Sequence, residues 1–207
     1  MIAPADALEE LRQGNRRFVG GETDAESIAR RSHRADQAGG QTPFAIILAC
    51  SDSRVPVEMV FDRGFGDLFV IRVAGNIVAP SQIGSIEFAA EQFGTRLVVV
   101  LGHTNCGAVT ATLNELALRA SHRSPNLRAI VDRVRPAVEP VLEKHRDDDN
   151  ATVLGAAIRA NIRASVECLS HGSLILEKLI GDGELIVVGA EYSIETGEVE
   201  FLDGNAV

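Results

Sequence analysis

The sequence predicts an α/β fold with a mostly parallel central sheet flanked by helices and an N-terminal helical arm. Three short runs, Phe44–Cys50, Asp67–Val73 and Arg96–Gly102, are continuous rather than alternating in hydrophobicity. Such runs are typical of parallel strands that are buried on both faces. Residues 81–93 lie between the second and third runs and place their apolar side chains on one helical face, as a strand–helix–strand crossover does. A fourth strand is expected at Glu184–Gly189.

The chain is expected to begin with an amphipathic helix over residues 6–18. Asp6 and Glu9 have the spacing of a capping box, and apolar residues follow at helical intervals. Residues 1–40 would form this helix and an irregular polar arm. No linker or repeat divides the chain, so we expect a single domain over residues 1–207.

Helices and a terminal hairpin are expected after the third apolar run. In the last long helix, Cys168 falls within an apolar pattern and is expected to pack in the core. The predicted elements are helices at 106–119, 126–145, 150–169 (capped by Asn150) and 173–180, and a hairpin over 192–202 that turns at Thr196 and Gly197.

Composition excludes several classes of function. The 207 residues carry a formal net charge of −9 and include one Tyr and no Trp, so neither the basic patch nor the stacking platform of a nucleic-acid binder is expected. The apolar runs are far shorter than the ~20 residues that span a bilayer, so no membrane partner is expected. The N-terminus lacks the apolar core of a secretory signal, and we expect a cytoplasmic protein. Three cysteines, an odd number, favour metal or catalytic thiols over a disulfide framework.

Two of the predicted strands end in side chains that bind metals. The first run ends at Cys50, and the third is followed by His103 and, three residues later, Cys106. Ligands of open α/β sheets bind beyond the carboxyl ends of the strands, so these side chains meet if the two strands are neighbours. Two thiolates and an imidazole form a known catalytic zinc set that leaves a fourth position open. Gly102 and Gly107 are expected to keep the backbone clear of the metal.

Asp52 and Arg54 follow the first of these cysteines. In an extended segment their side chains point the same way, and a guanidinium matches a carboxylate bidentately. The pair would keep Asp52 ionised beside the metal, where the carboxylate orients the attacking group or, in a closed form, itself becomes the fourth ligand. Taken alone, the same pair would be an ordinary surface salt bridge.

At these residues the sequence resembles the β-class carbonic anhydrases. The resemblance covers most of the chain and implies a mostly parallel sheet, zinc as the cofactor, and reversible hydration of carbon dioxide to bicarbonate and a proton. It implies that Cys50, His103 and Cys106 are the zinc ligands and that Asp52 and Arg54 form the catalytic dyad. The motifs that carry it are Cys50-Ser-Asp52-Ser-Arg54, His103-x-x-Cys106-Gly107, residues 69–76, residues 85–89 and the hairpin at Tyr192.

The resemblance also implies a pocket for carbon dioxide or bicarbonate. Gln41 matches a hydrogen-bonding glutamine, Phe69, Ala74 and Phe88 match an apolar wall, and Gly107 matches a backbone donor. In that family the pocket lies at a dimer interface, so the resemblance implies a homodimer or a homotetramer.

One departure from the family bears on regulation. A branch of the family binds inhibitory bicarbonate with a tryptophan three residues before the first zinc cysteine, together with an arginine and a tyrosine. Here Ile47 stands at the tryptophan position, although Arg72 and Tyr192 match the others. We therefore expect no steep cooperative inhibition by bicarbonate. Because two thiolates cancel the formal charge of zinc, we also expect the hydration rate to rise toward basic pH.

Three alternatives remain open from the sequence. The same site serves relatives that hydrolyse carbonyl sulfide. A non-catalytic zinc module would have Asp52 as a permanent fourth ligand, although such a structural site needs neither Arg54 nor Gln41. A nucleotide site at Gly102-x4-Gly107 lacks the lysine of a phosphate-binding loop.

Overall fold

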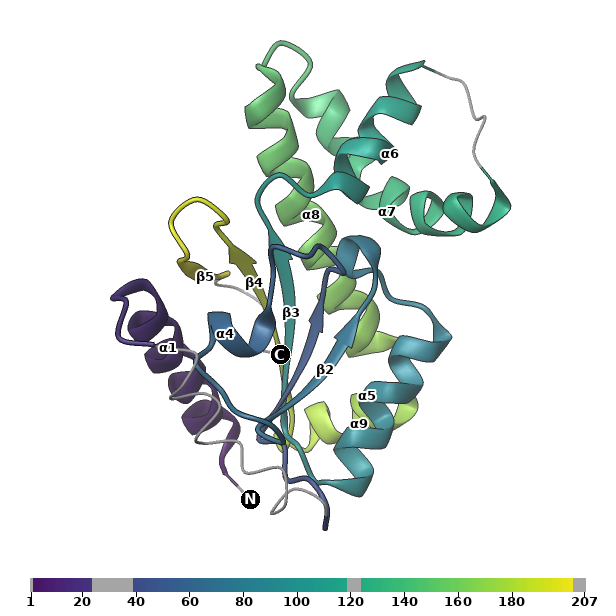
Figure 1. Cartoon of the computed structure of the whole chain (residues 1–207). Helices are drawn as coiled ribbons and strands as arrows, with labels where there is room; N and C mark the ends of the chain where they lie inside the picture. The colour runs from purple at the N-terminus through teal and green to yellow at the C-terminus, as the bar shows by residue number, and fades with distance from the viewer. Residues whose placement is uncertain (1, 24–38, 119–123, 203–207) are drawn as a thin grey trace.

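The structure is a computed structural model that describes residues 2–23, 39–118 and 124–202 (Figure 1). Its centre is a five-stranded sheet in the order β2-β1-β3-β4-β5. The first four strands of that order are parallel, and β5 pairs with β4 in the antiparallel sense. The predicted fold class, a mostly parallel sheet flanked by helices, is confirmed. The strands are β1 (Ala45–Ala49), β2 (Leu68–Arg72), β3 (Leu97–His103), β4 (Ile186–Tyr192) and β5 (Val199–Leu202).

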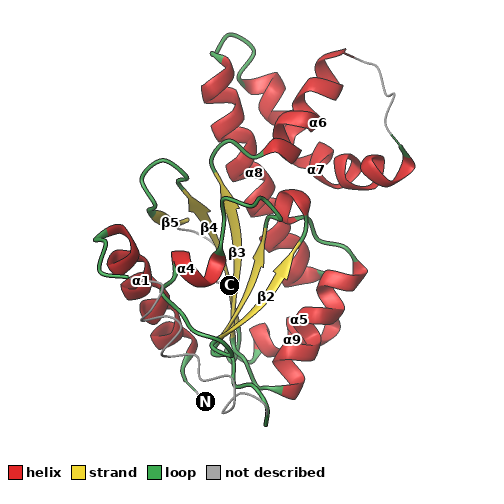
Figure 2. Ribbon diagram, in the orientation of Figure 1, coloured by secondary structure: helices red, strands yellow, loops and turns green. Residues whose placement is uncertain are grey.

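Helices cover both faces of the sheet (Figure 2). One face is covered by α1 and α4 and the other by α5, α8 and α9, while α6 and α7 lie beyond the carboxyl ends of the strands. Within the described part of the chain, none of the helices is long and apolar enough to cross a membrane. The helices are α1 (Pro4–Val19), α4 (Val57–Val60), α5 (Pro80–Gln92), α6 (Gly107–Leu118), α7 (Pro125–Lys144), α8 (Asn150–His171) and α9 (Leu174–Gly181), with a 3-10 turn, η1 (Ala74–Asn76), after β2.

The apolar runs are continuous because β1 and β3 are buried on both faces. In β1, Ile46 and Leu48 pack into a cluster with α5, α8 and α9. Ala45, Ile47 and Ala49 point the other way, into a second cluster with α1 and α4. Successive side chains of a strand face opposite sides of a sheet, so every position of β1 needs an apolar residue.

Glycine brings α8 close to the sheet. A Cβ on Gly102 of β3 would lie 2.5 Å from Cδ1 of Ile162, and a Cβ on Gly189 of β4 would lie 2.8 Å from Cγ2 of the same side chain. Only the absence of a side chain at both positions allows this contact. Helix packing therefore requires a glycine at position 102, whereas a Cβ on Gly107 would meet no protein atom within 4 Å.

Two of the predicted helix caps are wrong by a few residues. Helix α1 begins at Pro4 after Ala3, which makes no side-chain cap, so Asp6 lies in the first turn and forms no capping box. Proline is well suited to this first position, because its missing N–H has no partner there in any helix. Helix α8 is capped by Asp149, whose carboxylate accepts hydrogen bonds from two backbone N–H groups, and not by Asn150.

The expectation for Cys168 is also wrong, because its side chain is exposed. The buried face of this part of α8 is formed by residues 161, 162, 165, 166, 169 and 170, and position 168 lies outside it. The hairpin expected at 192–202 is confirmed, with Gly197 at φ 80° in its turn. Of the irregular arm expected before β1, residues 24–38 lie outside the described residues.

Candidate metal centre

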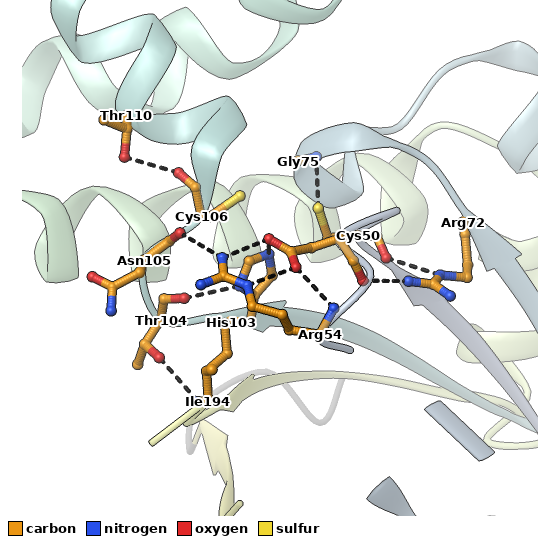
Figure 3. Close-up of polar contacts among 11 residues, drawn as sticks. Cys50, Arg54, Arg72, Gly75, His103, Thr104, Asn105, Cys106, Thr110 and Ile194 are labelled. Atoms are coloured by element: carbon orange, nitrogen blue, oxygen red, sulfur yellow. Dashed lines mark hydrogen bonds and ion pairs between the residues drawn. The ribbon is translucent and has the colours of Figure 1, made fainter. Parts of the chain in front are cut away.

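Two neighbouring strands bring the candidate ligands together. β1 pairs with β3 so that Ala49 is level with Leu101, and Cys50 and His103 therefore leave the sheet beside each other at its carboxyl edge. The side chains of Cys50, His103 and Cys106 are buried, and their ligand atoms all lie within 4.8 Å of one another (Figure 3). The expected convergence of the two strand ends is confirmed.

The imidazole of His103 is oriented by the backbone. Its Nδ1 lies 2.9 Å from the carbonyl oxygen of Thr104, which assigns the ring proton to Nδ1. Its Nε2 is buried, has no hydrogen-bond partner and lies 3.9 Å from Oδ2 of Asp52. Nε2 therefore presents a free lone pair, as the nitrogen of a metal-binding histidine does.

The two thiols interact strongly with each other. The hydrogen bond from Cys106 lowers the pKa of the Cys50 thiol, whereas the hydrogen bond to Cys50 and burial raise the pKa of Cys106. Burial lowers the pKa of His103, but the Cys50 sulfur, the Thr104 carbonyl and the Asp52 carboxylate together outweigh that effect and the pKa is raised. Metal coordination favours the thiolate form of a cysteine, so a bound cation would offset the raised pKa of Cys106. Two thiols and one free imidazole nitrogen in this arrangement fit a zinc ion.

Asp52 and Arg54 form the bidentate pair that their spacing suggests. Nε of Arg54 donates to Oδ1 of Asp52 at 2.9 Å, and Nη2 donates to Oδ2 at 2.7 Å. The backbone N–H of Arg54 adds a third hydrogen bond, to Oδ1 at 3.0 Å. The guanidinium holds the pKa of the Asp52 carboxyl well below its usual range. Both carboxylate oxygens are engaged by Arg54, and Asp52 does not belong to the group of three close ligand atoms.

Arg72, at the end of β2, holds the loop that carries the first cysteine. Its Nε donates to the carbonyl oxygen of Cys50 at 3.0 Å, and its Nη2 donates to the carbonyl oxygen of Asp52 (Figure 3).

The other two positions compared with the bicarbonate-binding branch, Tyr192 and Ile47, are both buried. Tyr192 is 5% exposed, and burial raises the pKa of its hydroxyl. Ile47 is fully buried in β1.

The expected pocket residues are divided between two regions of the chain. Two of them are near the candidate ligands. Ala74 lies in the turn that contacts Cys50, and Gly107 directly follows Cys106. Phe69 is level with Ile46 in the sheet, four residues before Cys50. At about 3.3 Å per residue, Phe69 therefore lies about 13 Å from the edge of the sheet that carries the candidate ligands. Phe88 lies on α5 and packs against Phe69, and Gln41 is exposed before β1. Within one chain, Gln41, Phe69 and Phe88 do not join the candidate ligands.

Two contacts of the site were not anticipated from the sequence. The backbone N–H of Gly75 donates to the Cys50 sulfur at 3.3 Å, and Arg72 supports the Cys50 loop as described above. Neither contact has a local sequence signal, because each joins β2 or the turn after it to the end of β1. The sequence analysis named Arg72 only for its match to an arginine of a bicarbonate site, and its position at the carboxyl end of a parallel strand is the one indication of its contact with the Cys50 loop.

Comparison with known proteins gives a consistent result. A profile of the carbonic anhydrase family matches residues 45–199. The chain is 36% identical over 203 residues to carbonic anhydrase 2 of Mycobacterium tuberculosis, covering 97% of this chain and 93% of that protein. It is 35% identical over 199 residues to a carbonic anhydrase of Mycolicibacterium smegmatis, covering 95% and 92%. The crystal structure of the β-carbonic anhydrase CafA of the fungal pathogen Aspergillus fumigatus matches with a TM-score of 0.74 and 25% identity, covering 83% of this chain and 80% of that one.

Proposed function

The chain belongs to the β-class carbonic anhydrases, and on that basis we propose that it binds zinc through Cys50, His103 and Cys106 and catalyses the reversible hydration of carbon dioxide to bicarbonate. The observation that carries this proposal is the buried group of two thiols and one imidazole nitrogen without a hydrogen-bond partner. When bound, zinc would supply Lewis acidity that lowers the pKa of a water molecule, although less strongly than zinc on three imidazoles does, because two of the ligands here are thiolates.

The dyad of Asp52 and Arg54 would position the reacting water. Oδ2 of Asp52 lies 3.9 Å from Nε2 of His103, so the carboxylate is close to the atoms that would hold the metal. Arg54 binds both carboxylate oxygens and keeps Asp52 ionised. An ionised, fixed carboxylate accepts a hydrogen bond from the reacting water. That hydrogen bond directs a lone pair of the water oxygen at carbon dioxide.

The substrate would occupy an apolar slot that two chains build together. Carbon dioxide has no net dipole and needs little more than a dry surface next to the reacting water. Ala74 and Gly107 are near the ligands of the same chain, whereas Gln41, Phe69 and Phe88 are not. We therefore propose a homodimer or homotetramer in which these three residues complete the site of the partner copy. In that arrangement the Gln41 amide would hold bicarbonate.

Stopped-flow measurement of carbon dioxide hydration, run beside hydrogen sulfide release from carbonyl sulfide, tests the proposed reaction. We expect rapid hydration with the zinc-loaded protein and none after chelation of the metal. Carbonyl sulfide hydrolysis without carbon dioxide hydration would replace the proposed substrate. A zinc-loaded protein without either activity would indicate a non-catalytic zinc module.

A further inference from the structure

The turn after β2 has an unusual backbone conformation. Gly75 has φ 72° and ψ 18°, and Asn76 has φ 44°, so two consecutive residues adopt left-handed backbone angles. Glycine does so freely, but asparagine does so at a cost that the surrounding structure must offset. A Cβ on Gly75 would also lie 3.1 Å from Cβ of Ala108 on α6. The turn therefore depends on contacts from other elements for its shape.

This turn contacts a candidate metal ligand. The backbone N–H of Gly75 donates to Sγ of Cys50 at 3.3 Å, and both groups are buried (Figure 3). A hydrogen bond to a thiolate is charge-assisted, and partners of this kind orient metal ligands and tune their affinity for the metal. Its geometry is fixed by the backbone angles at Gly75.

Two side chains of α8 hold the turn in place. Nδ2 of Asn161 donates to the carbonyl oxygen of Gly75 at 2.8 Å, and Oγ of Ser165 donates to the carbonyl oxygen of Asn76 at 3.1 Å. Asn161 is 2% exposed and Ser165 is 5% exposed. The two residues are four positions apart and so lie on the same helix face. Removing either donor would leave a buried carbonyl without that hydrogen bond.

The same part of α8 also packs on the strand that carries the histidine. Ile162 follows Asn161 and fills the space beside Gly102, the residue directly before His103. This close contact fixes the distance between α8 and the carboxyl end of β3. The helix therefore has a defined position relative to both strand ends of the metal centre.

We propose that Asn161 and Ser165 are positioning residues of the metal centre, which act by holding the turn at Gly75 and Asn76 so that its N–H group stays directed at the Cys50 sulfur. This inference rests on the proposed zinc site. It assigns to α8, a helix that supplies no ligand, control over how tightly the first cysteine holds the metal.

The test compares single substitutions on one helix. Ser165→Ala and Asn161→Ala each remove one hydrogen bond to the turn. Ser170→Ala is the matched control, since Ser170 is 3% exposed on the same helix but its hydroxyl donates at 2.9 Å to Val166 of α8 itself. Ser165→Thr retains a hydroxyl and serves as the rescue variant. Thermal unfolding of each metal-free protein shows whether the variants fold.

The readouts are the rate of zinc transfer to a chromophoric chelator and the thiolate-to-cobalt charge-transfer band of the cobalt-substituted protein. We expect Ser165→Ala and Asn161→Ala to release zinc about 10-fold faster than the parent chain and to shift the band. Ser170→Ala should match the parent chain in both measurements, and Ser165→Thr should return toward it.

The outcomes separate this inference from the proposed function. Parent-like zinc release and an unchanged band in both folded variants would overturn the positioning role and leave the zinc site intact. Equally fast release from Ser170→Ala would also overturn it, because general loosening of α8 would then be the cause. A parent chain that takes up no zinc or cobalt would overturn the proposed function itself.

Discussion

Arg54 is a solvent-exposed side chain that orients a carboxylate at the candidate metal centre. Its side chain is 51% exposed, yet it makes two hydrogen bonds to Asp52 and its backbone adds a third. An ion pair so exposed contributes little to the free energy of unfolding. Its consequence is geometric, because the bidentate contact restricts Asp52 to one orientation beside His103.

We predict that Arg54→Ala lowers kcat/KM for carbon dioxide hydration by about 10²-fold and leaves the zinc content unchanged. The reason is that Asp52 would lose its fixed orientation while the three proposed ligands remain. Stopped-flow assays and metal analysis of the same preparation measure both quantities. Arg16→Ala is the control, because it removes another exposed ion pair, the one that Arg16 makes with Glu9 on α1 at 2.6 Å. Full activity in Arg54→Ala would contradict the role of the dyad.

At the residue scale, local spacing predicted the candidate ligands but not the residues that support them. Cys50, His103 and Cys106 were identifiable because each follows an apolar run that ends at the same edge of the sheet. Asn161 and Ser165 have no such signal, because their partners are backbone carbonyls about 90 residues earlier. The exposure of Cys168 was missed because it lies between Val166 and Leu169 of the apolar pattern, whereas the helix turns position 168 away from their buried face.

At the element scale, α8 depends on Asp149 for its start. The carboxylate accepts hydrogen bonds from the N–H groups of Ala151 and Thr152 at 2.9 and 3.0 Å. These bonds satisfy two of the donors that every helix leaves unpaired at its first turn. Hydrogen bonding holds the pKa of the Asp149 carboxyl below its ordinary value. The largest effect comes from the N–H of Thr152, and smaller ones come from the Thr152 hydroxyl and the N–H of Ala151.

We predict that Asp149→Ala lowers the midpoint of thermal unfolding at pH 7 by roughly 2–4 °C, and that Asp149→Asn, which still caps, lowers it less. Because the folded pKa is depressed, the contribution of the charged cap is present above the ordinary pKa of an aspartate and is lost as pH falls through the folded value. The gap between the parent chain and Asp149→Ala should therefore shrink at about pH 3.5, measured by circular dichroism. A gap that is constant with pH would contradict this account.

Long elements were predictable from sequence, whereas short ones were not. The four parallel strands and the long helices have apolar patterns that single-sequence reasoning detects, with ends that shift by at most three residues. The four-residue helix α4 and the turn η1 have no periodicity to detect. Their shape depends on contacts with other elements, so the turn that touches Cys50 escaped prediction.

At the scale of the whole molecule, one side of the sheet has the features of an interface. β2 lies at the edge of the sheet, and Phe69, Phe88 and Phe93 form an aromatic cluster beside it with ring centroids 5.5 to 6.3 Å apart. Phe88 is 51% exposed, although a large aromatic side chain gains most from burial. A second copy of the chain that covers this cluster would also bring Gln41, Phe69 and Phe88 to the partner's site, as proposed above.

We predict a mass in solution of at least twice the 22.1 kDa of one chain, measured by size-exclusion chromatography with light scattering. Phe88→Glu should reduce the mass toward that of one chain and lower activity, because it places a charge in the aromatic cluster. Leu127→Glu, which alters a 49% exposed side chain on α7, is the control and should change neither. A monomeric parent chain with full activity would contradict the shared site.

The position of β1 beside β3 in the sheet was the expectation on which the metal centre depended, and the structure confirms it. The distribution of the expected pocket between two regions of the chain could not be derived in the same way. Spacing along one chain carries no information about which residues a second copy would supply.

Zinc analysis of the purified protein and of its cysteine variants tests the central claim most directly. We predict about one zinc per chain in the parent protein, loss of that zinc in both Cys50→Ala and Cys106→Ala, and retention in Cys168→Ala, whose thiol is exposed away from the site. Zinc that survives both Cys50→Ala and Cys106→Ala would contradict the account.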